Sequence, residues 1–179
     1  ARPTGGVITN IGASHLAGLG SIEGVSREKG ELAACLPPDG FLVLDADSRF
    51  SAGLRSSTAA RVISFSVEGE GALDARGLWF ESGTTRFLLN GEHEVELPML
   101  GVHCVQNLLA ALGACVGLGL ELCEVLPAVR RLHAGKRRME RIEAGGLLLF
   151  DDTYNANPES TRASIAVLKK EFQKALEIC

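Results

Sequence analysis

Residues 151–158, Asp-Asp-Thr-Tyr-Asn-Ala-Asn-Pro, constrain the fold most, because they separate two segments of different character. The apolar run at 147–150 predicts a buried strand, and a segment with helical periodicity begins at Glu159. Asn157 is a good helix N-cap, and Pro158 fits the first helical position, where a missing N–H has no consequence. Two carboxylates between a buried strand and a helix N-terminus are typical of a nucleotide and metal site in α/β proteins, although Asp and Asn are also ordinary turn formers.

Strand and helix patterns alternate through the rest of the chain and predict a mixed α/β fold with a β insert. Asn90-Gly91 is a strong hairpin signal, and Ser21 is a helix N-cap. The expected strands are 7–11, 41–45, 62–65, 85–89 and 92–97, and the expected helices are 21–36, 48–54, 105–117 and 123–132.

Composition excludes several classes of protein. The formal net charge of -4 gives no reason to expect a nucleic-acid partner, and no apolar run approaches the ~20 residues of a membrane-spanning helix. Five cysteines without a Cys-x-x-Cys spacing indicate neither a disulfide framework nor a zinc site. We therefore expect a cytoplasmic protein that is not inserted in a membrane, and a monomer.

Two segments carry candidate ligands, each with a simpler alternative. His15, in a Gly-rich loop, can offer imidazole to a divalent metal, and Lys29 becomes an oxygen ligand if it is carbamylated; alternatively, Lys29 belongs to a solvated helix face and His15 is no ligand. His103 and Asn107 lie one helical turn apart, and the Asn107 amide can pair with the edge of an adenine, or both are ordinary helix-start residues. Arg138 belongs to a basic cluster that either complements a helix C-terminus or binds phosphate or ribose.

The order of these segments closely resembles the Mur ligases of peptidoglycan synthesis. The resemblance runs through Thr-Asn-Ile-Gly-Ala-Ser-His-Leu at 9–16, Gly-Ser-Ile-Glu and Lys-Gly-Glu within 20–31, the His103 segment, Arg-Met-Glu at 138–140 and residues 151–158. It is strongest to the branch that joins D-alanyl-D-alanine to UDP-N-acetylmuramoyl-tripeptide. It covers the chain to about residue 168.

The resemblance implies a fold, a reaction and roles for individual residues. Residues 1–143 would be the later part of a central ATP-binding domain, and 144–179 the start of a Rossmann-like C-terminal domain. ATP would phosphorylate the tripeptide carboxylate, and the amine of D-alanyl-D-alanine would attack the acyl phosphate, in a step of cell-wall synthesis that serves cell shape and division. His15 and carbamylated Lys29 would be catalytic and bind Mg²⁺. The nucleotide would contact Asn107 (adenine), Asp152 (ribose), Arg138, His103, Asn155 and Asn157.

Departures from the family pattern define further expectations. Cys104 stands where the family usually has Asn, and Arg137 where it usually has Gly. The family's Gly-Lys-Thr/Ser phosphate-binding loop is expected before residue 1, so we expect the chain to be a fragment that is inactive alone. Folylpolyglutamate synthase and cyanophycin synthetase are rival ligases, but they lack the Tyr-Asn-Ala-Asn-Pro string. A non-catalytic nucleotide-binding module is the alternative of another class.

Overall fold

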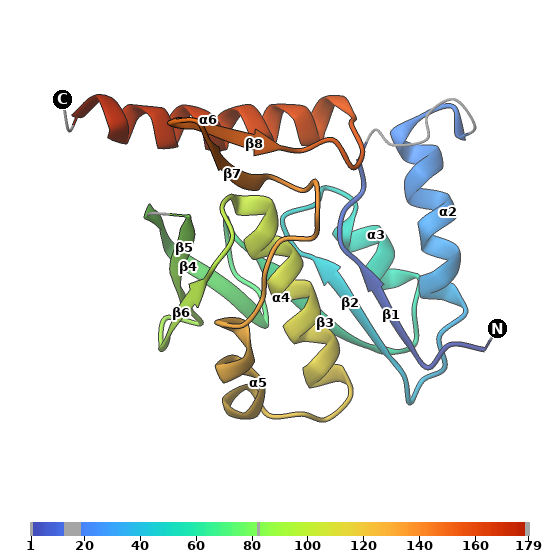
Figure 1. Ribbon diagram of the computed structural model, residues 1–179. Coiled ribbons are helices and arrows are strands. Elements are labelled where there is room, and N and C mark those ends of the chain that lie inside the picture. Colours follow the sequence, from blue (N-terminus) through green and yellow to red (C-terminus); the bar gives the residue numbers. More distant parts are fainter. Residues whose placement is uncertain (1, 13–18, 82, 178–179) are drawn as a thin grey trace.

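The computed structural model describes residues 2–12, 19–81 and 83–177 (Figure 1). Six strands form one sheet in which spatial order follows chain order. Its first three strands and the start of the fourth are parallel, whereas the last three are antiparallel. The strands are β1 (Gly5–Ile8), β2 (Phe41–Asp45), β3 (Arg61–Ser66), β4 (Leu73–Glu81), β5 (Thr84–Leu89) and β6 (His93–Leu97).

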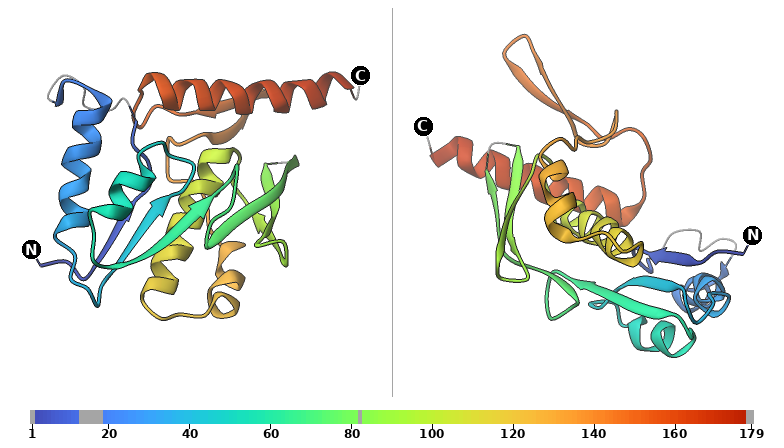
Figure 2. Two further views of the ribbon diagram at one scale, coloured as in Figure 1. Left: turned by 180° about the vertical axis from the view of Figure 1, so that it is seen from behind. Right: turned by 90° about the horizontal axis from the view of Figure 1, so that it is seen from below.

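Helices cover both faces of the parallel part of the sheet, as Figure 2 shows from below. Helices α2 (Ile22–Ala34) and α3 (Ser51–Ser56) lie on one face, and α4 (Val102–Gly117) and α5 (Leu122–Val129) belong to the other side. Alternation along β2 divides the core accordingly, because Leu42 and Leu44 pack with the α2 and α3 residues while Val43 packs with α4. The mixed α/β class predicted from the sequence is confirmed.

Helix α4 lies very close to β2 because glycines face the sheet. A Cβ on Gly113 would come within 2.7 Å of Val43 Cγ1, and a Cβ on Gly117 would overlap the ring of Phe41. The Arg61 guanidinium donates to the carbonyl oxygens of Val116 (3.3 Å) and Gly117 (3.4 Å), which satisfies acceptors at the helix C-terminus. These contacts fix the position of α4, whose other end faces the site described below.

The C-terminal part consists of a two-stranded hairpin and a long helix. Strand β7 (Glu140–Ala144) pairs antiparallel with β8 (Leu147–Asp151), and α6 (Pro158–Glu177) follows. The expected domain boundary after residue 143 falls within this hairpin. The hairpin projects away from the main sheet in the right-hand view of Figure 2, which is seen from below.

The prediction of a buried strand at 147–150 was wrong. Strand β8 forms, but Leu147 is 67% exposed and Leu149 is 50% exposed. The reason is topological: among the described residues β8 pairs with β7 alone, outside the six-stranded sheet, so few side chains cover its faces.

The helix cap and the hairpin turn that the sequence predicts from a few adjacent residues are both confirmed. Ser21 caps α2, with its hydroxyl oxygen accepting the Gly24 N–H at 3.1 Å. The Asn90-Gly91 pair has φ of 53° and 71°, as a tight hairpin turn requires. The first strand, expected at 7–11, lies at Gly5–Ile8 instead, because residues beyond Ile8 leave the sheet and line a cleft. No helix in the described part of the chain is long and apolar enough to cross a membrane.

Candidate functional site

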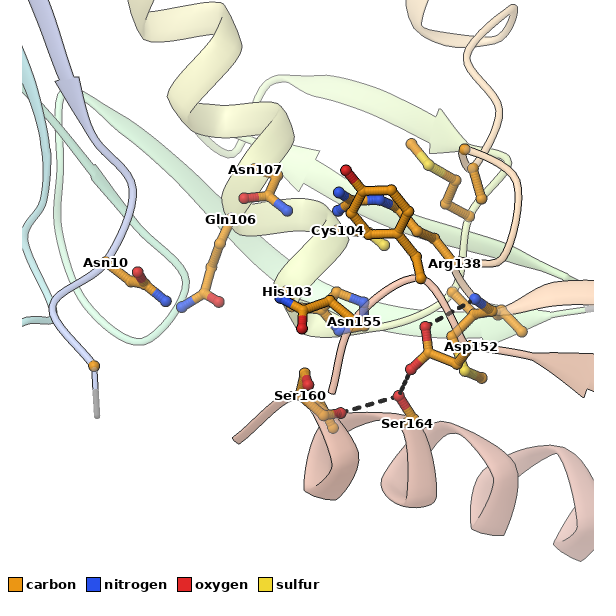
Figure 3. A pocket seen from close by; sticks show the side chains of 18 of the residues that line it. Asn10, His103, Cys104, Gln106, Asn107, Arg138, Asp152, Asn155, Ser160 and Ser164 are labelled. Carbon is orange, nitrogen blue, oxygen red and sulfur yellow. Dashed lines mark hydrogen bonds between the residues drawn. The ribbon is translucent and has the colours of Figure 1, made fainter. Parts of the chain in front are cut away.

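A cleft of about 1320 Å³ lies beside the carboxyl ends of the parallel strands (Figure 3). Its walls come from four regions: the residues after β1, β2 and β3, the N-terminus of α4, the segment 133–141, and the β8–α6 loop. The carboxyl edge of a parallel sheet is where α/β proteins commonly bind their ligands. The fold therefore brings together segments that are up to 154 residues apart, from Asn10 to Ser164.

Two aspartates, one at the end of β2 and one just after it, organise one side of the cleft. The Asp47 carboxylate accepts hydrogen bonds from the Ser66 hydroxyl (2.6 Å) and the Val67 N–H (2.8 Å), which ties the ends of β2 and β3 together. Asp45 accepts the Asp47 N–H at 3.0 Å. Burial raises the pKa of Asp45, and the nearby carboxylates of Asp47 and Glu68 act in the same direction. Asp47 therefore has a structural role in shaping this wall.

The first two turns of α4 supply another wall. Its N-cap is Gly101, whose φ of 111° suits glycine, and His103, Cys104 and Asn107 all line the cleft. Burial lowers the pKa of His103 despite the opposing charge of Asp152. Burial, assisted by Asp152, raises the pKa of the Cys104 thiol to about 11, so this thiol stays protonated at neutral pH. His103 and Asn107, which were expected on one face of a helix, thus both lie on the α4 wall of the cleft.

Asp152 connects three elements at the edge of the cleft (Figure 3). Its Oδ1 accepts the Met139 N–H at 3.2 Å, and its Oδ2 accepts the Ser164 hydroxyl at 2.5 Å. The carboxylate, which directly follows β8, therefore joins this end of the hairpin to the residue before β7 and to α6. Both oxygens retain a lone pair for a further donor.

Arg138 stacks on an aromatic ring at the same edge. Its guanidinium carbon lies 4.2 Å from the centre of the Tyr154 ring, within the range of a cation–π contact. The Tyr154 N–H donates to the Arg137 carbonyl at 3.0 Å, so the 137–139 segment and the β8–α6 loop are held together by backbone as well as side chain. Arg138 and Tyr154 both line the cleft.

The two loop asparagines are used partly for local structure. Asn157 Oδ1 accepts the Ser160 N–H at 2.9 Å, which confirms its predicted role as the α6 N-cap. Asn155 Oδ1 accepts the Ala156 N–H at 2.9 Å. Each still lines the cleft, and the amide NH₂ groups are the parts of these side chains available to a ligand.

The predicted metal pair is only partly described. His15 lies outside the described residues. Lys29 Nζ donates to the Asn10 carbonyl at 2.7 Å, next to the cleft, although Lys29 is not itself among the residues that line it. Within the described residues, no group of three or more His, Cys, Asp or Glu side chains could hold a metal ion.

Sequence reasoning missed Tyr154 and Ser164 as individual cleft residues. Tyr154 stands within the string at 151–158, so a signal was present, but its role as a stacking partner depends on where Arg138 lies. Ser164 gives no signal in the sequence, because it looks like an ordinary polar residue on an amphipathic helix.

The model of the Mur ligase middle domain matches residues 1–115, well over half of the chain. This chain belongs to the Mur ligase family. The Mur ligase chain is 34% identical over 174 residues to UDP-N-acetylmuramoyl-tripeptide--D-alanyl-D-alanine ligase of Mycobacterium tuberculosis strain H37Rv, an alignment that covers 94% of this chain and 34% of that protein. It thus spans about a third of the length of that curated relative.

Solved structures of Mur ligases agree with this assignment. The crystal structure of MurF from Acinetobacter baumannii matches with a TM-score of 0.86 and 33% identity, over 93% of this Mur ligase chain and 37% of that one. MurF ligase from Thermotoga maritima, solved in complex with ADP, matches with a TM-score of 0.81 and 26% identity, over 94% of this chain and 39% of that one. The predicted family is therefore confirmed.

Proposed function

We propose that this chain is the nucleotide-binding part of an ATP-dependent ligase that joins D-alanyl-D-alanine to UDP-N-acetylmuramoyl-tripeptide, in the bacterial cytoplasm. Residues 1–143 would belong to its central domain and 144–179 to the start of the next. The names of the relatives support the reaction, and the ADP complex of the Thermotoga maritima protein supports the nucleotide.

One observation carries the proposal: Asn107, Arg138 and Asp152, from three separate segments of the chain, line a single cleft. Their chemistry matches the three parts of a nucleotide. An amide offers a donor and an acceptor to an adenine edge, a guanidinium pairs with phosphate oxygens, and a carboxylate accepts hydrogen bonds from ribose hydroxyls.

The cleft also suits the charge of the reaction. In the proposed reaction, ATP transfers its γ-phosphoryl group to the tripeptide carboxylate, ADP leaves, and the D-alanyl-D-alanine amine displaces phosphate from the acyl phosphate. Enzymes of this kind act mainly by positioning and by stabilising the charge on the transferred group. Arg138 contributes positive charge at this edge, while stacking on Tyr154 restricts its orientation. Burial lowers the pKa of His103, which favours the neutral form of its ring at the cleft wall.

Magnesium is part of the proposal through His15 and a carbamate on Lys29. Mg²⁺ supplies charge neutralisation on the phosphates when it is bound. The bond from Lys29 Nζ to the Asn10 carbonyl is compatible with this modification, because a carbamylated amine keeps one N–H and can still donate. Carbamylation would also replace a positive charge beside the metal with an anionic oxygen ligand.

Phosphate release by the full-length protein tests the proposal. We expect release only when ATP, UDP-N-acetylmuramoyl-tripeptide and D-alanyl-D-alanine are all present. Arg138→Ala should lower the apparent affinity for ATP, and the exposed Arg55→Ala is the matched control. Release driven by a different acceptor and amino acid would assign another branch of the family. Nucleotide binding without any release would favour a non-catalytic module.

A further inference from the structure

Ser164 makes a contact that the proposed chemistry does not use. It lies on α6, two turns after the N-cap, and its hydroxyl donates to Asp152 Oδ2 across the cleft edge (Figure 3). The same hydroxyl oxygen lies 2.9 Å from the Ser160 carbonyl, one turn earlier on the helix. Two acceptors therefore compete for one hydroxyl proton.

The carboxylate is the stronger acceptor of the two. Hydrogen bonds to an ionised oxygen are shorter and stronger than those to a neutral carbonyl, and the Ser160 carbonyl, inside the helix, already has the N–H of residue 164 as its regular partner. Ser164 Oγ lies nearer to Asp152 Oδ2, at 2.5 Å, than to the Ser160 carbonyl oxygen, at 2.9 Å. Ser164 thus fixes the rotation of the carboxylate from one side, while the Met139 N–H fixes it from the other at 3.2 Å.

The position of Ser164 is itself fixed by packing. Val167, three residues further along the same helix face, is 7% exposed. A Cβ on Gly101 would come within 3.1 Å of Val167 Cγ2, so α6 rests directly on the N-cap of α4. Since α4 also carries Asn107, this contact relates the serine and the carboxylate to the cleft wall that α4 forms.

We propose that Ser164 is a positioning residue that orients the Asp152 carboxylate toward the ribose hydroxyls of the bound nucleotide. The inference rests on the proposed function, in which Asp152 contacts ribose. With two bonds already made, Asp152 keeps one lone pair on each oxygen, which suits two neighbouring hydroxyl donors. Without the serine, only the 3.2 Å bond from the Met139 N–H restrains rotation about χ2, which is a broad torsion in aspartate.

Comparing the binding of nucleotides with and without ribose hydroxyls distinguishes a role of Ser164 in orienting Asp152 from a role in the stability of the fold. The affinities of the full-length protein for ADP and for 2′,3′-dideoxy-ADP are measured by titration calorimetry, in the wild type, Ser164→Ala, Asp152→Asn and the control Thr161→Ala. Thr161 is an exposed residue on the same helix and is not among the cleft-lining residues. We expect Ser164→Ala to weaken ADP binding about three- to tenfold and to leave dideoxy-ADP binding unchanged. A purely structural role would weaken both ligands equally.

The variants distinguish failure of the inference from failure of the proposed function. If Asp152→Asn removes the preference for ADP over dideoxy-ADP while Ser164→Ala keeps it, the positioning role is overturned and the ribose contact stands. If Asp152→Asn also keeps the preference, the ribose contact and the positioning role both fail. If the wild type binds neither nucleotide, the proposed function itself is overturned.

Discussion

Arg137 adopts a backbone conformation that favours glycine, and Arg137→Gly should therefore stabilise the cleft edge. Its φ is 60°, in the left-handed region. That region is unfavourable for a residue with a Cβ by about 1–2 kcal/mol. The Mur ligase pattern described above has Gly at this position, so the substitution restores a residue without the conformational penalty.

The expected gain is reduced by the flexibility of glycine in the unfolded chain. Relative to Ala, glycine loses about 0.4–1 kcal/mol more on folding, and the midpoints of the two ranges leave a net stabilisation of about 0.8 kcal/mol for Gly over Ala at position 137. The backbone bonds of Arg137 are retained in every variant, because its N–H donates to Glu140 Oε2 at 3.0 Å and its carbonyl accepts the Tyr154 N–H. The comparison of Gly with Ala therefore isolates the backbone conformation.

Amide hydrogen exchange at Tyr154 measures this local stability, because its N–H is bonded to the Arg137 carbonyl. We expect exchange in Arg137→Gly to be about two- to fivefold slower than in Arg137→Ala. Arg137→Ala removes the same charged side chain and keeps the strained φ, which makes it the matched control. Equal or faster exchange in the glycine variant would refute the reasoning from backbone strain.

Three further substitutions test the site and the core. Lys29→Ala should abolish most ligase activity of the full-length protein, with partial recovery on adding short carboxylic acids in place of the lost carbamate; near-wild-type turnover would make Lys29 a solvated helix residue. Cys104→Asn should tighten ATP binding about three- to tenfold by adding one neutral hydrogen bond to adenine, and equal affinities by titration calorimetry would show that position 104 does not touch the nucleotide. Gly113→Val should lower the free energy of unfolding by about 1–3 kcal/mol, because its side chain overlaps Val43; an unchanged urea midpoint would contradict the close packing of α4 on β2.

The sequence predicted elements well where a few adjacent residues determine the structure. Asn157 and Pro158 start α6, and Asn90-Gly91 forms the hairpin turn, because each signal acts within one turn of backbone. The apolar run at 147–150 failed as a burial signal, since burial depends on which strands lie beside it. A run of hydrophobic residues specifies a strand more reliably than it specifies the partner that covers the strand.

In the candidate site, too, single residues could be predicted from the sequence, but the contacts between distant segments could not. Resemblance to the family selected Arg138 and Asp152 one residue at a time, but their arrangement depends on contacts between segments that no local pattern contains. Tyr154 stacks on Arg138, and Ser164 reaches Asp152 from a helix that begins six residues after it. Both contacts require the chain to reverse direction between β7 and α6.

The backbone conformation around Arg138 determines where its guanidinium lies. Residues 137 and 139 on either side both have positive φ, of 60° and 53°. Two such residues around a single one turn the chain sharply, so the Met139 N–H faces Asp152 while the Arg138 side chain lies over Tyr154. The positive charge is therefore held at the cleft edge by a conformation that most side chains disfavour, and the Asp152 and Tyr154 contacts stabilise that conformation in return. Loss of either contact should loosen the position of Arg138 even though its own side chain is unchanged.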